Sequence, residues 1–135
     1  MTMLNSLEGL TSFLIYFSSS LGFVLIFCLI YCWLTPYDEI KKIKEGNIAP
    51  AISFGGALIG FILPLASAIS ESEYFIDMLI WAGIAMIIQC TVFETVRFFF
   101  KDLVREIEHN HIAAATLLGF LSIAIGILNA ASMTY

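Results

Sequence analysis

Charged residues are scarce in this sequence. They make up 13% of its 135 residues, while hydrophobic residues make up 60%. Soluble domains carry roughly 25% charged residues, and far fewer cannot cover a surface that faces water. The composition therefore predicts an integral membrane protein embedded in the lipid bilayer. Basic clusters and long polar tails are missing as well, so we expect no nucleic-acid partner.

The sequence also lacks the marks of a cleaved signal and of reactive cysteines. Its amino terminus has no basic residue and carries Glu8, and the apolar segment that follows is too long for a signal peptide. The three cysteines, Cys28, Cys32 and Cys90, all fall in apolar runs. Cys28 and Cys32 share a helix face, which would suit a metal or redox pair, but hydrocarbon disfavours the thiolate form. We interpret them as small packing residues.

Catalytic and metal-binding motifs are not apparent. There is no nucleophile elbow, no phosphate-binding glycine loop and no pair of intramembrane aspartates. The stretch "EIEHNH" contains Glu106, Glu108, His109 and His111, but not the H-E-x-x-H spacing of a zinc site. The sequence therefore predicts a non-enzymatic protein without a cofactor or a metal.

Four apolar segments fill most of the chain: roughly Leu10–Leu34, Ile48–Ile69, Phe75–Phe100 and Ile112–Met133. Each has about twenty residues or more, and at ~1.5 Å per residue each can cross a ~30 Å hydrocarbon core as a helix. Barrel strands would instead alternate over about ten residues. We predict an all-α membrane protein with four transmembrane helices, forming a single membrane domain over residues 1–135.

The basic residues indicate how the helices are oriented. All six lie in or beside the first and third connections between spans, at Lys41, Lys42, Lys44, Arg97, Lys101 and Arg105. Because positive charge stays on the cytoplasmic side, we expect these links in the cytoplasm and both termini on the outer side of the membrane. Within the first link, Ile40 and Ile43 are three apart. This segment either extends the first helix or lies on the membrane surface.

The two halves of the chain resemble each other. Sliding the sequence by 64 positions, the separation of Ile48 from Ile112, aligns them. The identical positions in the first half are Ile48, Ala49, Ala51, Gly55, Ile59 and Ala66. Because each half holds two spans, the halves run in the same direction. We predict two parallel two-helix repeats, residues 10–69 and 74–133.

Small residues recur on two of the spans. Gly56, Gly60 and Pro64 follow one another every four residues on the second, and Gly119 and Gly126 lie on the fourth. This small-xxx-small pattern lets helix backbones approach closely in lipid, within a chain or between chains. Lining a narrow passage is the alternative. Pro64 removes a backbone donor and should bend its helix. The alternatives are a bend alone, which we favour, or a replacement of the missing hydrogen bond by Ser67 or Asn129.

Polar residues inside the spans are the other candidates for a site. The third span contains Asp77, Gln89, Glu94 and Arg97, and Asn129 lies in the fourth. Glu94 and Arg97 are three apart and can pair on one helix face, and Arg97 can also snorkel to the interface. A buried amide such as Gln89 commonly joins helices. These five residues are our candidates for a polar pathway or a partner site, against a purely structural role.

From Thr35 to Ile69, "TPYDE" followed by "AISFGGALIGFILPLASAI" resembles the YjfL-type family of small bacterial inner-membrane proteins, the UPF0719 family or domain of unknown function 350. Further matches are Asp77, Gln89, Phe93, "HNHIAAATLLG" and "ILNAASMTY". The resemblance covers nearly the whole chain and implies a duplicated four-span protein, with no catalytic residues to carry over. It also implies an envelope-maintenance role, because relatives are encoded beside phage-shock-type proteins and ATP-grasp ligases.

Two functions remain open on the sequence. The first is a self-associating membrane module, a homo-oligomer that presents its charged links to lipid headgroups or to a cytoplasmic or membrane-stress partner protein. The second is an oligomeric channel or transporter that passes an ion or a small solute by Gln89 and Glu94.

Overall fold

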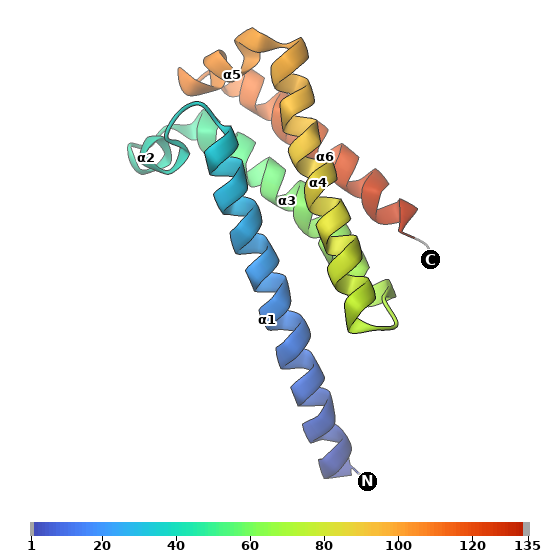
Figure 1. Cartoon of the computed structure of the whole chain (residues 1–135). Helices are drawn as coiled ribbons and strands as arrows, with labels where there is room; N and C mark the ends of the chain where they lie inside the picture. Colours follow the sequence, from blue (N-terminus) through green and yellow to red (C-terminus); the bar gives the residue numbers. More distant parts are fainter. Residues whose placement is uncertain (1, 134–135) are drawn as a thin grey trace.

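The computed structural model describes residues 2–133, and its ordered elements over this range are six helices: α1 (Thr2–Leu34), α2 (Glu39–Lys44), α3 (Ile48–Glu71), α4 (Phe75–Phe99), α5 (Lys101–Glu108) and α6 (Ile112–Ser132). The four long helices α1, α3, α4 and α6 are long and apolar enough to cross a membrane. The short helices α2 and α5 lie together at one end of the bundle, while the N-terminus lies far away at the other (Figure 1). The predicted fold class of four transmembrane helices is confirmed.

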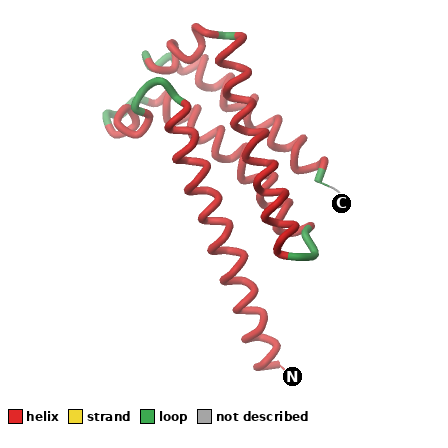
Figure 2. The backbone as a smooth tube through the Cα atoms, viewed as in Figure 1, coloured by secondary structure: helices red, strands yellow, loops and turns green. Residues whose placement is uncertain are grey.

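The first helix is much longer than the predicted span. It begins at Thr2, not at Leu10, and has 33 residues, or about 50 Å at ~1.5 Å per residue. A ~30 Å hydrocarbon core cannot contain this length without tilt or protrusion. The first turns of α1 extend beyond the other helices (Figure 2), and the Tyr16 ring then meets Phe75 of α4 edge-on. The end of α1 at Leu34 follows from Pro36, which disfavours helical geometry at the preceding Thr35.

The link after α1 folds as a separate helix, so the possibility that it extends α1 is wrong. Asp38 caps α2 because its side chain accepts a hydrogen bond from the Lys41 backbone N–H at 3.2 Å. The helix ends where Gly46 adopts a positive φ of 90°. The third connection likewise forms a helix of its own, α5.

The ends of α2 and α5 share one hydrogen-bond pattern. After α2, the three backbone donors of residues 45, 46 and 47 reach the carbonyls of residues 41, 43 and 42. After α5, the donors of residues 109, 110 and 111 reach the carbonyls of residues 105, 107 and 106, each 64 positions later. Gly46 and Asn110, also 64 apart, are the two residues of positive φ in the described chain. The duplication stays a prediction, and this recurrence supports it.

The α3–α6 pair forms the centre of the bundle, and α4 packs on both of its members. The buried face of α4 recurs every three or four residues, at Met78, Ala82, Ala85, Gln89, Phe93 and Val96. Asn110, just before α6, ties the pair together at its charged end. Its side-chain Oδ1 accepts a hydrogen bond from the Ala49 backbone N–H at 2.9 Å, which caps the first turn of α3.

Contacts between aromatic rings join the second half of α1 to α3 and α4. The Phe27 ring stacks on Phe61 of α3 at a centroid distance of 4.7 Å. The Tyr31 ring meets Phe54 of α3 and Phe93 of α4 edge-on, at 5.5 and 5.1 Å. Phe27 and Tyr31 are almost completely buried. Because they are four residues apart, they lie on one face of α1, and this face fixes the helix against α3 and α4.

Candidate functional site

The glycines of α3 and α6 face one another within the chain. A Cβ atom added to Gly56 would collide with the Gly119 backbone, and one added to Gly60 would collide with the backbone of Ser122. A Cβ on Gly126 would collide in turn with Gly60. The two helices therefore meet backbone against backbone. These glycines neither line a passage within the chain nor remain free for a second copy, so an oligomer needs another surface.

Pro64 also favours the close contact between α3 and α6. Because proline has no N–H, the carbonyl of Gly60, four residues earlier, has no donor from its own helix. The position of a Cβ on Gly126 falls against this carbonyl oxygen, so the Cα hydrogen of Gly126 faces it instead. The alternative of a replacement by Ser67 is wrong, because its hydroxyl donates to the Ala130 carbonyl of α6 at 3.1 Å. Asn129 does not supply it either, since its Nδ2 makes no hydrogen bond.

Gln89 lies at this crossing. Its side chain is 3% exposed, and its Oε1 is 3.0 Å from where a Cβ on Gly60 would stand. Neither its Oε1 nor its Nε2 has a hydrogen-bond partner among the described residues. A buried amide without partners loses the free energy of its hydrogen bonds with water. Gln89 therefore contacts the α3–α6 crossing from α4 without forming a hydrogen bond to it.

The remaining polar candidates lie toward the ends of α4. Asp77 is half-buried in its first turn. Near the other end, Arg97 Nη1 is 3.6 Å from Glu94 Oε1, so the predicted pair is present. Arg97 Nη1 also donates to the Leu34 carbonyl at 3.1 Å and thereby joins α4 to the end of α1. The five candidates do not gather at one place, because Gln89 and Asn129 are buried while the ion pair is half-exposed.

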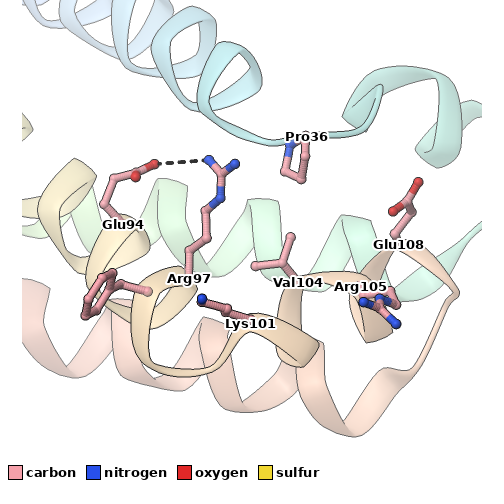
Figure 3. A pocket seen from close by; sticks show the side chains of 8 residues that line it. Pro36, Glu94, Arg97, Lys101, Val104, Arg105 and Glu108 are labelled. Atoms are coloured by element: carbon pink, nitrogen blue, oxygen red, sulfur yellow. Dashed lines mark ion pairs between the residues drawn. The ribbon is translucent and has the colours of Figure 1, made fainter.

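The ion pair borders a cavity of about 410 Å³ between the α1–α2 connection, α4 and α5 (Figure 3). Its lining residues are Pro36, Glu94, Arg97, Phe98, Lys101, Val104, Arg105 and Glu108. Three of the six basic residues of the chain thus surround one space. Glu94–Arg97 is the one ion pair within residues 2–133, so no carboxylate of this range lies within 4 Å of Lys101 or Arg105. In the sequence, these two cations indicate only the topology of the chain.

A buried carboxylate lies at the same end of the bundle and was missed from the sequence. Glu39 of α2 is 1% exposed, and neither carboxylate oxygen has a hydrogen-bond partner among the described residues. Burial raises the pKa of Glu39 to about 7, while the nearby Thr35 and Tyr37 hydroxyls act in the opposite direction. Glu39 is four residues before the half-buried Ile43, whereas Ile40 is exposed. The inward face of α2 therefore carries Glu39 and not Ile40.

These observations define the class of the chain: a polytopic helical membrane protein whose basic residues concentrate at one end of a glycine-packed bundle. The family described as Domain of Unknown Function (DUF350) matches residues 4–133, so the chain belongs to this family. The resemblance inferred from the sequence is thereby confirmed.

The relatives agree on the location. The chain is 38% identical to the UPF0719 inner membrane protein YjfL of Escherichia coli (strain K12) over 129 residues, 96% of this chain and 98% of the relative. It is 26% identical to the UPF0719 transmembrane protein YshE of Bacillus subtilis (strain 168) over 115 residues, 83% of this chain and 82% of the relative. No solved structure matches. The chain is an integral inner membrane protein of the UPF0719 family.

Proposed function

We propose that the chain is a non-enzymatic membrane module that works by self-association through the amino-terminal half of α1. One observation carries this proposal: α1 is the least buried span, with 11% of its most apolar stretch buried against 44% for α3. Between α1 and α3 runs an apolar groove of about 560 Å³, to which α1 contributes the small residues Gly9, Ser12 and Ser20 among larger ones such as Phe13 and Phe17. Small residues along a groove favour close packing of another helix.

The assembly would place a helix of a second copy in this groove, since the glycine faces of α3 and α6 are already occupied.

The charged end would face the cytoplasm and both termini the outside, following the positive-inside rule. The envelope-maintenance role implied by the family resemblance, with a membrane-stress protein as partner, is part of the same proposal. Labelling of a cysteine at position 72 from the cytoplasmic side alone would contradict this orientation.

The test of assembly is the mass of the purified protein in lipid nanodiscs or mild detergent. Gly9→Leu with Ser12→Leu fills the groove and should convert an oligomer to a monomer. The control is Gly22→Leu, which lies on the same helix but does not line the groove and has open space at its Cβ. A wild-type protein that is monomeric in lipid, or an oligomer that survives the double variant, would disprove the proposal.

The buried amide of Gln89, which lacks hydrogen-bond partners, favours conduction of an ion or a solute as a second candidate. Vesicles containing the wild-type protein should then show a flux that Gln89→Leu with Glu94→Gln abolishes. The absence of flux from the wild-type protein across monovalent ions and small solutes would reject this candidate.

A further inference from the structure

The cavity beside Glu94 and Arg97 has the charge of an anion site. Three basic side chains and two carboxylates line it, so its formal charge is +3 − 2 = +1. The two cations Lys101 and Arg105 have no ion-pair partner among residues 2–133. In a chain of formal net charge −5, this is an unusual concentration of positive charge. A single negative charge would balance it.

Arg97 is already held in place for such a ligand. Its Nη1 donates to the Leu34 carbonyl and lies beside Glu94 Oε1, so the side chain is oriented from two sides. A guanidinium has five N–H donors, and donors beyond this nitrogen remain for a ligand. Figure 3 shows Arg97 reaching toward the Glu94 carboxylate near Pro36, with Lys101 lying beneath it on the next turn. A preoriented arginine beside a lysine suits the oxygens of a phosphate group.

The position of the cavity in the membrane and the residues at its opening indicate which kind of molecule would supply that phosphate. The cavity lies where α1 and α4 end, which for spanning helices is the boundary between hydrocarbon and water. Phe98 lines it and is 70% exposed, and the neighbouring Phe99 and Phe100 are exposed too. Aromatic side chains are favoured at this boundary. A ligand that contacts both the basic side chains of the cavity and these exposed aromatic rings has an anionic head and apolar chains.

We propose that this cavity binds the phosphodiester headgroup of an anionic phospholipid, with Arg97, Lys101 and Arg105 around the phosphate and the acyl chains beside Phe98 and Phe99. The single charge of a phosphodiester matches the +1 of the cavity, and basic pockets between membrane helices are known to hold such headgroups. The site does not depend on self-association, because all of its lining residues come from one chain.

The test counts phosphatidylglycerol molecules bound to the detergent-solubilised protein by native mass spectrometry at 0.15 M salt, where exposed charges are screened beyond about 8 Å. Lys101→Gln with Arg105→Gln should weaken the binding of one lipid about tenfold or more, while Lys101→Arg with Arg105→Lys should retain most of it. The matched control, Lys41→Gln with Lys44→Gln, removes two charges from α2 outside the cavity and should change binding less than about twofold. Circular dichroism verifies that the variants remain helical.

Three outcomes would overturn the proposal. If the α2 control weakens binding as much as the cavity variant, the lipid responds to diffuse charge. If phosphatidylcholine binds as tightly as phosphatidylglycerol, the cavity does not recognise an anionic headgroup. If inorganic phosphate displaces the lipid at a similar concentration, the cavity takes a free phosphate and the acyl chains contribute nothing.

Discussion

The α3–α6 crossing and the first half of α1 occupy the same bilayer but pack in opposite ways. At the crossing, glycines bring two backbones into contact, whereas α1 leaves large apolar side chains such as Leu10, Phe13 and Leu14 half-exposed. Yet the most apolar stretch of α1 is more hydrophobic than those of α3 and α6. In lipid, hydrophobicity does not drive helices together, because the solvent is as apolar as the side chains. Shape and small residues decide which helices pack.

The largest effect is expected where the two backbones meet. Gly56→Leu should destabilise the fold by more than about 3 kcal/mol, since its Cβ alone would collide with the Gly119 backbone and the helices must separate. Gly55→Leu is the matched control one residue away, with open space at its Cβ. Unfolding in mixed micelles, followed by circular dichroism, measures both. Equal losses for the two variants would show that the crossing does not hold the bundle.

A similar effect is expected from Glu39, where α2 covers the junction of α1 with α3. Its pKa is about 7 in the folded protein against 4.5 as the ordinary value, so the folded state binds its proton more tightly than the unfolded state. The favourable contribution is full below pH 4.5 and is lost as pH rises through 7, amounting to roughly 3 kcal/mol. Stability should therefore fall between pH 5 and pH 8.

Glu39→Gln should remove most of this pH dependence and stabilise the protein at pH 8, as measured by thermal unfolding in detergent across the pH range. The other titratable groups around Glu39 are Tyr31, Cys32 and Tyr37. These weak acids ordinarily keep their protons below pH 8. Asp38→Asn is the control, because Asp38 is the adjacent carboxylate and caps α2. An unchanged slope in the Glu39 variant would show that the carboxylate is solvated.

The smallest expected effect on stability comes from removing single rings in the two halves of α1. Phe27→Ala should cost about 2 kcal/mol, because a buried ring stacked on Phe61 is lost while lipid replaces little of its contact area. Phe13→Ala should change stability by less than about 0.5 kcal/mol, although Phe13 also stacks on a ring, that of Phe17. Both rings of that pair are half-exposed at the open groove beside α3, so lipid fills the space. Comparable losses in the same unfolding assay would mean that the first half of α1 is packed in the isolated chain.

Much of the architecture could be predicted from the sequence. The predicted starts of the second, third and fourth spans, Ile48, Phe75 and Ile112, are the starts of α3, α4 and α6. Apolar runs bounded by proline, glycine and charge locate helix ends well in a chain where lipid enforces the backbone hydrogen bonds. The start of α1 was placed too late because its polar first turns interrupt the apolar run.

The candidate site was predictable only in part. The Glu94–Arg97 pair follows from a spacing of three along one helix, which is a local rule. The cavity beside it requires the turn between α4 and α5 to bring Lys101 and Arg105 toward the end of α1, a relation between elements that no spacing encodes. Glu39 was missed for the same reason, since the face of α2 that turns inward depends on what lies beneath it.

The sequence by itself determined the environment, the number of crossings and the end of the bundle that holds the positive charge. These properties depend on composition and on the order of neighbouring residues. They are decisive in lipid, because each apolar segment there must satisfy its backbone hydrogen bonds within a helix. Only the tertiary structure decided that the glycines of α3 meet those of α6 within one chain and that most side chains in the first half of α1 stay exposed. A small residue permits close contact with any neighbour, and the three-dimensional arrangement alone selects which neighbour it is.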